Sequence, residues 1–276
     1  RLTKMLTINK KQKAFYEKIE IETINDEENL IARTWGKIRH RIHHDAAGDL
    51  RVWTDLYDKH WEWMGQLSEK SVLDLGCYIG NPLSLQIADK SKDYFAIDLS
   101  EKAIEVYQQS LQEAGLDNAR AEAVDFLSPD FQQKYKEKFD IVYAHSVAHH
   151  FEHFDVFLEN LSNVLKPGGM VITFDPLQTS TLIRTVRTLY RPFQSDRHWE
   201  WPFTKSSFNV IRNYFEIDGV RGTMGNAKWA IPIYLFSRKL GVKFGKRWHE
   251  RDKRETTTVG KGLWKCLHVS MCWRKK

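Results

Sequence analysis

A short apolar strand that runs into a glycine-punctuated turn constrains this chain more than any other feature. Residues 72–82 read Val-Leu-Asp-Leu-Gly-Cys-Tyr-Ile-Gly-Asn-Pro, with Gly76 and Gly80 four positions apart. Asn81 stands where a helix N-cap residue is expected, and Pro82 stands at the first helical position. Backbone amides in such a turn, together with a helix N-terminus, can surround the charged end of a nucleotide-like ligand. The pattern therefore predicts a strand–turn–helix unit that binds a cofactor.

The dinucleotide-binding fingerprint does not fit this turn. The pattern G-x-G-x-x-G would need glycine where the chain has Tyr78 and Asn81, and the Tyr78 side chain would obstruct the approach of a pyrophosphate. An NAD-dependent oxidoreductase is therefore the weakest of the functions considered. A second apolar run, residues 94–98, ends in Asp98, whose carboxylate is well placed to accept hydrogen bonds from ribose hydroxyls.

Strands and helices alternate after this turn. Ser100 is expected to cap a helix over residues 101–113, and Gly115 is expected to end it. A further helix is expected over residues 208–214. Further strands are expected over residues 119–124, 139–144, 170–174, 215–221 and 263–273. This alternation predicts an α/β fold with a parallel sheet.

The order of these motifs resembles that of class I S-adenosylmethionine-dependent methyltransferases, over about residues 71–176. The motifs are an acid two residues before a glycine, a second glycine four residues on, Asp98, the pair Asp125-Phe126, and Leu-Lys-Pro-Gly-Gly at 165–169. The chain looks most similar to small-molecule members such as the quinone-pathway methyltransferases. The resemblance implies a Rossmann-like, seven-stranded, mostly parallel sheet with helices on both faces, and S-adenosylmethionine as cofactor. The cofactor-binding residues that it implies are Asp74, Gly76, Cys77, Tyr78, Gly80, Asn81, Asp98, Leu99, Asp125, Phe126 and His145.

Four histidines fall within residues 145–153, after the fourth expected strand. A hydroxyl acceptor must lose a proton, and histidine is the usual base near neutral pH. In the family that the chain resembles, the carboxyl end of this strand faces the sulfonium. We expect His149 or His150 to act as base or orienting residue, with His145 as a third candidate; alternatively, one of them only caps or packs the next helix. We expect no metal. Ser146, His149 and His150 stand where some quinone-pathway relatives place acidic ligands, and the first two positions lack the carboxylates that Mg²⁺ prefers.

Two regions flank or interrupt the expected core, residues 67–276. Residues 1–66 are expected to form a helical N-terminal cap, with helices starting at Asn25 or Asp26 and over residues 50–67; its aromatic residues either pack on the sheet or line an acceptor pocket. Residues 177–204 are expected to form a lid or substrate segment, because they mix guanidinium and indole side chains. Arginine binds carboxylate or phosphate through a planar fork, and tryptophan supplies a flat apolar wall. The candidate substrate-binding residues are Arg187, Arg191, Trp199 and Trp201, unless this segment is only an aromatic cluster with surface ion pairs.

Positive charge is concentrated near the C-terminus. The formal net charge is +6, yet residues 234–276 hold thirteen Lys or Arg against three Asp or Glu. Within an expected basic insertion, residues 222–262, an apolar stretch adjoins a cationic one over residues 229–254. Interfacial membrane binders combine apolar and cationic segments in this way. We expect either a peripheral membrane contact there or a solvated helical face.

The leading interpretation is a methyltransferase that acts on a small or lipid-linked, anionic acceptor, by in-line displacement at an oxygen atom. The alternatives are an RNA methyltransferase and a cofactor-binding scaffold that docks a membrane or partner through its basic insertion. We expect no nucleic-acid partner, because the fourth strand lacks the Asn/Asp-Pro-Pro-Tyr/Phe signature. Three cysteines without a C-x-x-C pair suit a reducing cytosol, and no apolar stretch reaches the ~18 residues of a membrane span. The expected location is therefore cytoplasmic, at a membrane surface if the basic insertion makes the membrane contact considered above.

Overall fold

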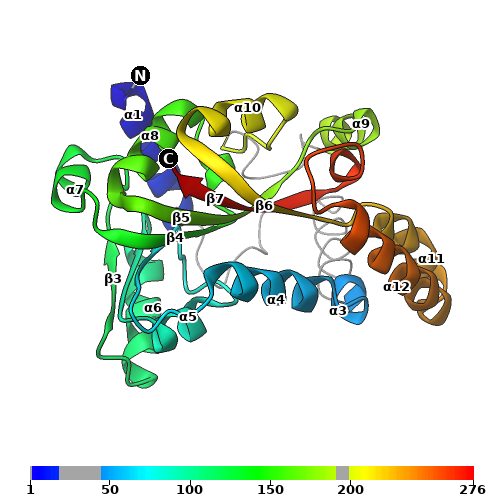
Figure 1. Ribbon diagram of the computed structural model, residues 1–276, viewed down its shortest axis with the longest axis horizontal. Coiled ribbons are helices and arrows are strands. Elements are labelled where there is room, and N and C mark those ends of the chain that lie inside the picture. Colours follow the sequence, from blue (N-terminus) through cyan, green and yellow to red (C-terminus); the bar gives the residue numbers. More distant parts are fainter. Residues whose placement is uncertain (1, 19–44, 191–198) are drawn as a thin grey trace.

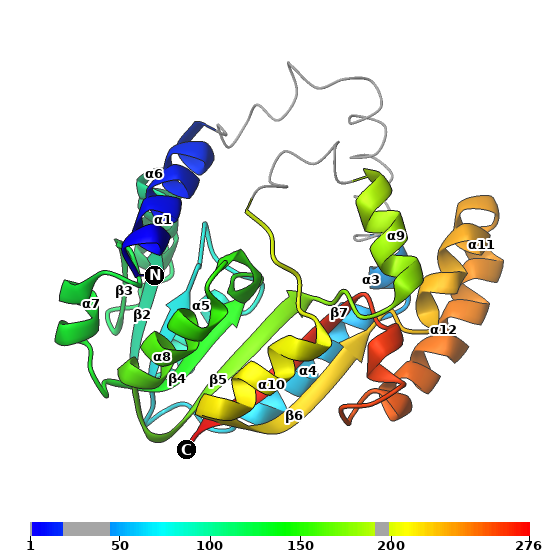
Figure 2. The same cartoon turned by 90° about the horizontal axis from the view of Figure 1, so that it is seen from above.

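Seven strands form one sheet in the computed structural model of this chain, which describes residues 2–18, 45–190 and 199–276 (Figures 1 and 2). The first five strands run parallel, and β7 is antiparallel to both of its neighbours. The mostly parallel, seven-stranded sheet predicted from the sequence is therefore confirmed. In sheet order the strands are β3 (Ala119–Ala123), β2 (Asp93–Asp98), β1 (Ser71–Leu75), β4 (Phe139–His145), β5 (Leu165–Pro176), β7 (His268–Lys275) and β6 (Phe215–Thr223).

Helices cover both faces of this sheet. Helices α4, α5 and α6 lie on one face, and α7, α8 and α10 lie on the other (Figure 1). The α-helices are α1 (Leu2–Lys18), α3 (Ala47–Asp49), α4 (Val52–Met64), α5 (Ser84–Lys90), α6 (Glu101–Glu113), α7 (Pro129–Lys134), α8 (Phe154–Val164), α9 (Thr181–Tyr190), α10 (Lys205–Tyr214), α11 (Ala230–Phe236) and α12 (Arg238–Glu255). In the part of the chain that the structure describes there are also three short 3₁₀ helices: η2 (Ala148–His150), η4 (Ala227–Trp229) and η5 (Leu263–Lys265).

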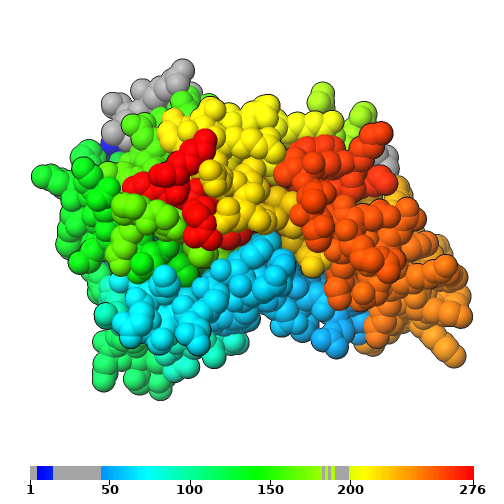
Figure 3. All heavy atoms as spheres, viewed as in Figure 1, coloured from blue at the N-terminus to red at the C-terminus, as the bar shows by residue number. Residues whose placement is uncertain are grey.

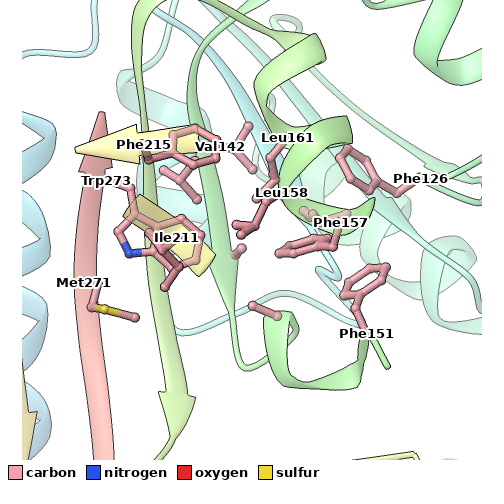
Figure 4. Close-up of a cluster of buried hydrophobic side chains, with 14 of the residues drawn as sticks. Phe126, Val142, Phe151, Phe157, Leu158, Leu161, Ile211, Phe215, Met271 and Trp273 are labelled. Carbon is pink, nitrogen blue, oxygen red and sulfur yellow. The ribbon is translucent and has the colours of Figure 1, made fainter. Parts of the chain in front are cut away.

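Burial on both faces explains why the central strands are mostly apolar. Successive side chains of a strand point to opposite faces, so Val72 joins the apolar cluster under α5 and α6, and Leu73 joins the one under α8 and α10. Figure 4 shows the second cluster, in which α8 and α10 pack against β4, β6 and β7. Its labelled side chains are Phe126, Val142, Phe151, Phe157, Leu158, Leu161, Ile211, Phe215, Met271 and Trp273.

Local sequence determines where α6 starts but does not determine where α5 starts. The Ser100 hydroxyl accepts the backbone N–H of Ala103 at 3.2 Å, so the predicted cap of α6 is confirmed. The prediction that Asn81 caps the next helix and that Pro82 opens it is wrong, because α5 begins only at Ser84. The Asn81 side chain instead donates to the buried carboxylate of Asp74 at 3.0 Å. A tertiary hydrogen bond has replaced the expected local cap.

The N-terminal part contributes one helix to the face of the sheet. Helix α4 corresponds to the helix expected over residues 50–67, and the indole of Trp63 lies so close to Gly219 of β6 that a Cβ there would be 2.6 Å from its Nε1. Aromatic residues of α4 therefore pack the helix onto the sheet. The helix expected from Asn25 or Asp26 lies outside the described residues. The division between a cap, residues 1–66, and a core, residues 67–276, stays a prediction.

The segment between β6 and β7 is a helical pair followed by a short turn of helix. Helices α11 and α12 pack against each other at one end of the molecule (Figure 3). The final strand begins at His268 rather than at Leu263, where it was expected. Leu263 is fully buried in η5, so its apolar character reflects packing in the core and not strand pairing.

Candidate functional site

A cavity of about 320 Å³ opens at the carboxyl ends of β1, β2 and β4. In open parallel sheets, ligands bind at this edge, where the strand order reverses, and the order here reverses between β1 and β4. Most of its walls are apolar side chains, with two carboxylates among them. The residues that line it are Asn9, Gln12, Leu75, Gly76, Tyr78, Ile97, Asp98, Leu99, Val124, Asp125, Phe126, Ser146, Val147, His150 and Phe151.

The glycine turn after β1 forms one wall of the cavity. Gly76 has a φ of +68°, and a Cβ built there would lie 2.4 Å from Cγ2 of Val147, so only glycine fits. Tyr78 also has a positive φ, +50°, and its side chain is 41 % exposed. Tyr78 also lines the cavity, so this partly exposed residue forms part of the cavity wall.

Asp98, at the end of β2, is held in place by two backbone amides. Its Oδ2 accepts the N–H of Tyr78 at 3.0 Å, and its Oδ1 accepts the N–H of Ser100 at 2.9 Å. Burial raises the pKa of this carboxyl, and the two backbone hydrogen bonds oppose that shift. The turn after β1 and the start of α6 thus fix the orientation of one carboxylate at the cavity wall.

Asp125 follows β3 and connects the cavity to the N-terminal helix. Its Oδ1 accepts the N–H of Leu127 at 2.9 Å and the side-chain amide of Asn9 at 2.8 Å. Burial raises the pKa of the Asp125 carboxyl, and these two hydrogen bonds lower it. Phe126 lines the cavity and is otherwise buried in the aromatic core. Asp98, Leu99, Asp125 and Phe126 are therefore brought to one cavity.

Five of the predicted cofactor-binding residues do not line this cavity: Asp74, Cys77, Gly80, Asn81 and His145. The carboxylate of Asp74 is fully buried and accepts hydrogen bonds from Tyr94 at 2.6 Å, from Asn81, and from the Ser84 hydroxyl. Burial raises its pKa to about 6. Cys77 is fully buried in the core under α5 and α6, and a Cβ on Gly80, whose φ is +106°, would lie 2.9 Å from the ring of Tyr107. In this structure Asp74, Cys77, Gly80 and Asn81 support the turn from behind, because their side chains or Cα atoms face the helices.

The two candidate bases after β4 have different surroundings. His150 lines the cavity, and its Nδ1 lies 2.7 Å from the carbonyl oxygen of Trp199. A carbonyl only accepts, so Nδ1 carries the proton and Nε2 of the neutral ring has the lone pair. His149 is 6 % exposed, and its Nδ1 and backbone N–H both donate to Oδ1 of Asp175, at 2.8 and 3.1 Å. The ring centroids of the two histidines are 4.2 Å apart, so His149 supports the residue that reaches the cavity.

His145 lies behind the described cavity, under α4. Its ring stacks on Phe174 with centroids 5.0 Å apart, and its Nε2 is 3.5 Å from the hydroxyl of Tyr57. Burial lowers the pKa of His145 to about 4, so its imidazole is neutral at pH 7. A neutral imidazole in an aromatic cluster suits an orienting role better than a role that requires a positive charge.

The end of the predicted lid is tied to the histidine segment by its backbone. The N–H of Trp201 donates to the carbonyl oxygen of His149 at 2.7 Å, and the carbonyl of Trp199 accepts from His150. Arg187 lies on α9, and Arg191 lies outside the described residues. The structure thus places two of the four candidate substrate residues beside the candidate base.

Sequence reasoning missed the contribution of the N-terminal helix. Asn9 and Gln12 are 5 % and 4 % exposed, and Gln12 donates to the carbonyl oxygen of His150 at 3.2 Å. With Met5 they follow a spacing of four and three, which is one face of a helix. Two amides and a methionine are a weak apolar signal, so only this spacing could have indicated a buried face. Ser146 and Val147, also at the cavity, were likewise not identified as site residues.

Within residues 2–18, 45–190 and 199–276 there is no group of three or more His, Cys, Asp or Glu side chains that could hold a metal ion. Among the same residues, none of the helices has both the length and the apolar character needed to cross a bilayer.

Comparison with known proteins identifies relatives of this fold. A family model described as a methyltransferase domain matches residues 66–211. A protein of Mycobacterium ulcerans described as "Probable phthiotriol/phenolphthiotriol dimycocerosates methyltransferase 2" is 36 % identical over 104 residues, 37 % of this chain and 38 % of that protein. A fatty-acid O-methyltransferase of Mycolicibacterium smegmatis is 32 % identical over 107 residues, 38 % of this chain and 37 % of that protein.

The matches with curated relatives span about two fifths to half of their length. Among solved structures, geranyl diphosphate C-methyltransferase from Streptomyces coelicolor has a TM-score of 0.59 at 10 % identity, covering 98 % of both chains. At that identity the likeness supports the fold alone.

Proposed function

Because the chain belongs to the methyltransferase domain family, we propose that it is an S-adenosylmethionine-dependent methyltransferase that methylates an oxygen atom of a small or lipid-linked acceptor. The observation that carries this proposal is the cavity at the reversal point of the sheet. Its two carboxylates, Asp98 and Asp125, stand at the ends of neighbouring strands, and most of its other walls are apolar.

The residues of this cavity fit the proposed cofactor. Both oxygens of Asp98 already accept backbone N–H groups, so the carboxylate is oriented before binding and can accept ribose hydroxyls through its remaining lone pairs. Leu99 and Val124 supply apolar walls for a flat base, and Asp125 supplies an acceptor for its amino group. Gly76 packs closely against Val147 and has no side chain, so the backbone of the turn is exposed to the cavity at this position. These residues would bind the nucleoside part of the cofactor.

The cofactor, when bound, supplies a methyl group on a positively charged sulfur. The protein must align an acceptor atom with that group and exclude water, which is chiefly an effect of proximity and orientation. His150 is the residue proposed to take the acceptor proton, since its Nδ1–H is fixed by the carbonyl of Trp199 and Nε2 is left as the basic atom. His149, held by Asp175, is proposed as a positioning residue for it. His145, which lies behind the cavity, is proposed as a second positioning residue.

The proposed class of acceptor rests on the relatives and on the lid. The relatives from Mycobacterium ulcerans and Mycolicibacterium smegmatis are named for dimycocerosate and fatty-acid methyl transfer, which supports an acceptor with a long apolar part. Arg187 and Arg191 are proposed to bind its anionic group, and Trp199 and Trp201 to contact its apolar part. A membrane contact through residues 229–254 would suit such an acceptor.

Calorimetric titration with S-adenosylmethionine and S-adenosylhomocysteine, with NADH as negative control, tests the cofactor. Asp98→Ala removes an acceptor of charge-assisted hydrogen bonds and should weaken affinity by about ten- to a hundredfold. Asp93→Ala is a matched control, because Asp93 opens the same strand and pairs with the partly exposed Arg120 away from the cavity. Equal affinity in wild type and Asp98→Ala, or binding of NADH, would refute the proposed cofactor site.

Transfer of a labelled methyl group tests the acceptor class. We expect transfer to a hydroxy or carboxyl lipid, and loss of turnover in His150→Gln with little change in cofactor affinity. A panel that includes RNA separates the alternatives: transfer to RNA alone would contradict the lipid-linked acceptor. Cofactor binding without transfer to any acceptor would favour a scaffold.

A further inference from the structure

An exposed apolar tip projects from the end of the molecule where α11 meets α12. Phe236, the last residue of α11, is 94 % exposed, and Leu235, Leu240 and Phe244 are 40–48 % exposed. These four residues, here called the apolar tip, are contributed by the end of α11 and the first turns of α12. Folding leaves Phe236 in water together with three apolar residues that are close to it in sequence. Such a group marks an interaction surface, whereas single apolar residues scattered over a surface do not.

A cationic face adjoins the apolar tip on α12. Lys239, Lys243, Lys246 and Arg247 are all exposed, and residues 229–249 contain no Asp or Glu. Arg238 differs from them, because it forms an ion pair with Asp49 at 2.8 Å. The surface is therefore positive beside the tip, and an anionic partner would complement it.

The opposite side of α12 is packed too closely to move away. A Cβ on Gly241 would lie 2.4 Å from Cα of Tyr234, and one on Gly245 would lie 2.5 Å from Cδ2 of Leu50. His249 donates to Asp55 of α4 at 2.9 Å. These contacts fix α12 against α11, α3 and α4, so the apolar tip cannot be covered by a small rotation of the helix.

The tip points to the same side of the molecule as the cavity. Figure 2 shows the turn between α11 and α12 and helix α9 on the side toward which β4 and β5 point. The cavity lies at that edge of the sheet. A flat surface that contacts the tip would therefore face the side from which an acceptor reaches the site.

We propose that the apolar tip and the cationic face dock the protein on an anionic lipid bilayer. Phe236 and Leu240 enter the boundary between headgroups and acyl chains, while Lys239, Lys243 and Arg247 contact anionic headgroups. RNA would be attracted by the same cations and can stack a base on Phe236. It would leave the aliphatic side chains of Leu235 and Leu240 in water, so the bilayer accounts for more of the surface. Docking itself does not depend on methyl transfer; delivery of a lipid-linked acceptor rests on the proposed function.

Co-sedimentation of the full chain with lipid vesicles tests this proposal. We expect binding to phosphatidylcholine vesicles that contain about one-third phosphatidylglycerol, and at least about tenfold weaker binding to phosphatidylcholine alone. The double variant Phe236→Ser/Leu240→Ser should bind the anionic vesicles about tenfold more weakly. Lys239→Gln and Lys243→Gln should each weaken binding by about fivefold, and added salt should reduce that difference.

Matched controls lie on α6, which packs at the β3 edge of the sheet, opposite to the β6 edge. Val106→Ser removes an apolar side chain that is 42 % exposed, and Lys102→Gln removes an exposed cation. Both should leave vesicle binding unchanged, and all variants should keep the affinity of wild type for S-adenosylmethionine. That second readout separates failure of docking from failure of the cofactor site.

Three results would overturn the proposal. Wild type could fail to sediment with anionic vesicles, it could bind neutral and anionic vesicles equally, or the tip and cation variants could bind as wild type does. Salt-sensitive binding of RNA without vesicle binding would assign the cationic face to nucleic acid instead.

Discussion

The buried carboxylate of Asp74 allows a quantitative test of the turn's architecture. Burial raises its pKa to about 6, against the three hydrogen bonds donated by Ser84, Tyr94 and Asn81, which lower it. In the unfolded chain the pKa of an aspartate is about 3.9. The folded protein therefore binds more protons between these two values, and the free energy of unfolding falls as pH rises from ~4 to ~6. The difference of about two pKa units between the unfolded and the folded state corresponds to about 3 kcal/mol of unfolding free energy. This contribution is fully lost above the folded pKa.

Asp74→Asn removes the charge and with it this pH-dependent contribution. We expect the variant to gain about 3 kcal/mol relative to wild type between pH ~4 and ~7, whatever constant offset the altered hydrogen bonds introduce. Urea unfolding followed by tryptophan fluorescence at several pH values measures the difference. Asp93→Asn is the control, because Asp93 opens β2 on a partly exposed ion pair with Arg120. A pH-independent difference between wild type and Asp74→Asn would refute the reasoning, and a difference of opposite sign would mean that hydrogen bonding outweighs burial.

Three other substitutions test the cavity. Gly76→Ala forces a left-handed conformation on alanine and pushes its Cβ into Val147, so urea unfolding should show a loss of about 2–4 kcal/mol, whereas Val147→Ala made together with it should restore part of that loss. His150→Gln should lower kcat and abolish the acidic limb of its pH profile while cofactor affinity changes little; an unchanged profile would contradict a role as base. Asn9→Ala leaves the buried carboxylate of Asp125 without one donor, so calorimetry should show cofactor affinity about fivefold or more weaker, and wild-type affinity would show that α1 is not part of the site.

Local sequence pattern was sufficient to predict the succession of strands along the chain and the carboxylates that follow two of them. Asp98 and Asp125 each follow a short apolar run, and the carboxyl ends of parallel strands meet at one edge, so their proximity follows from topology. The starts of α6 and β6 could also be read from a serine cap and from the change of apolar spacing.

Contacts between distant residues could not be read in this way. The carboxylate of Asp74 bonds to Tyr94, twenty positions away, and this network draws Asn81 away from the helix start where local preference put it. Gln12 and Asn9 reach the cavity from more than a hundred positions away. Such pairings depend on which helix covers which edge of the sheet, which no local periodicity specifies.

The attachment of α1 to the cavity has a thermodynamic consequence. Asn9 and Gln12 hold the helix through Asp125 and the backbone of His150, two groups at the wall where the cofactor is proposed to bind. If occupation of the cavity favours the docked helix, reciprocity requires that docking of the helix favours occupation by the same factor. Hydrogen exchange of the α1 amides would then report ligand binding without any assay of turnover. Substitutions on this helix would change the affinity of the cavity for its ligand.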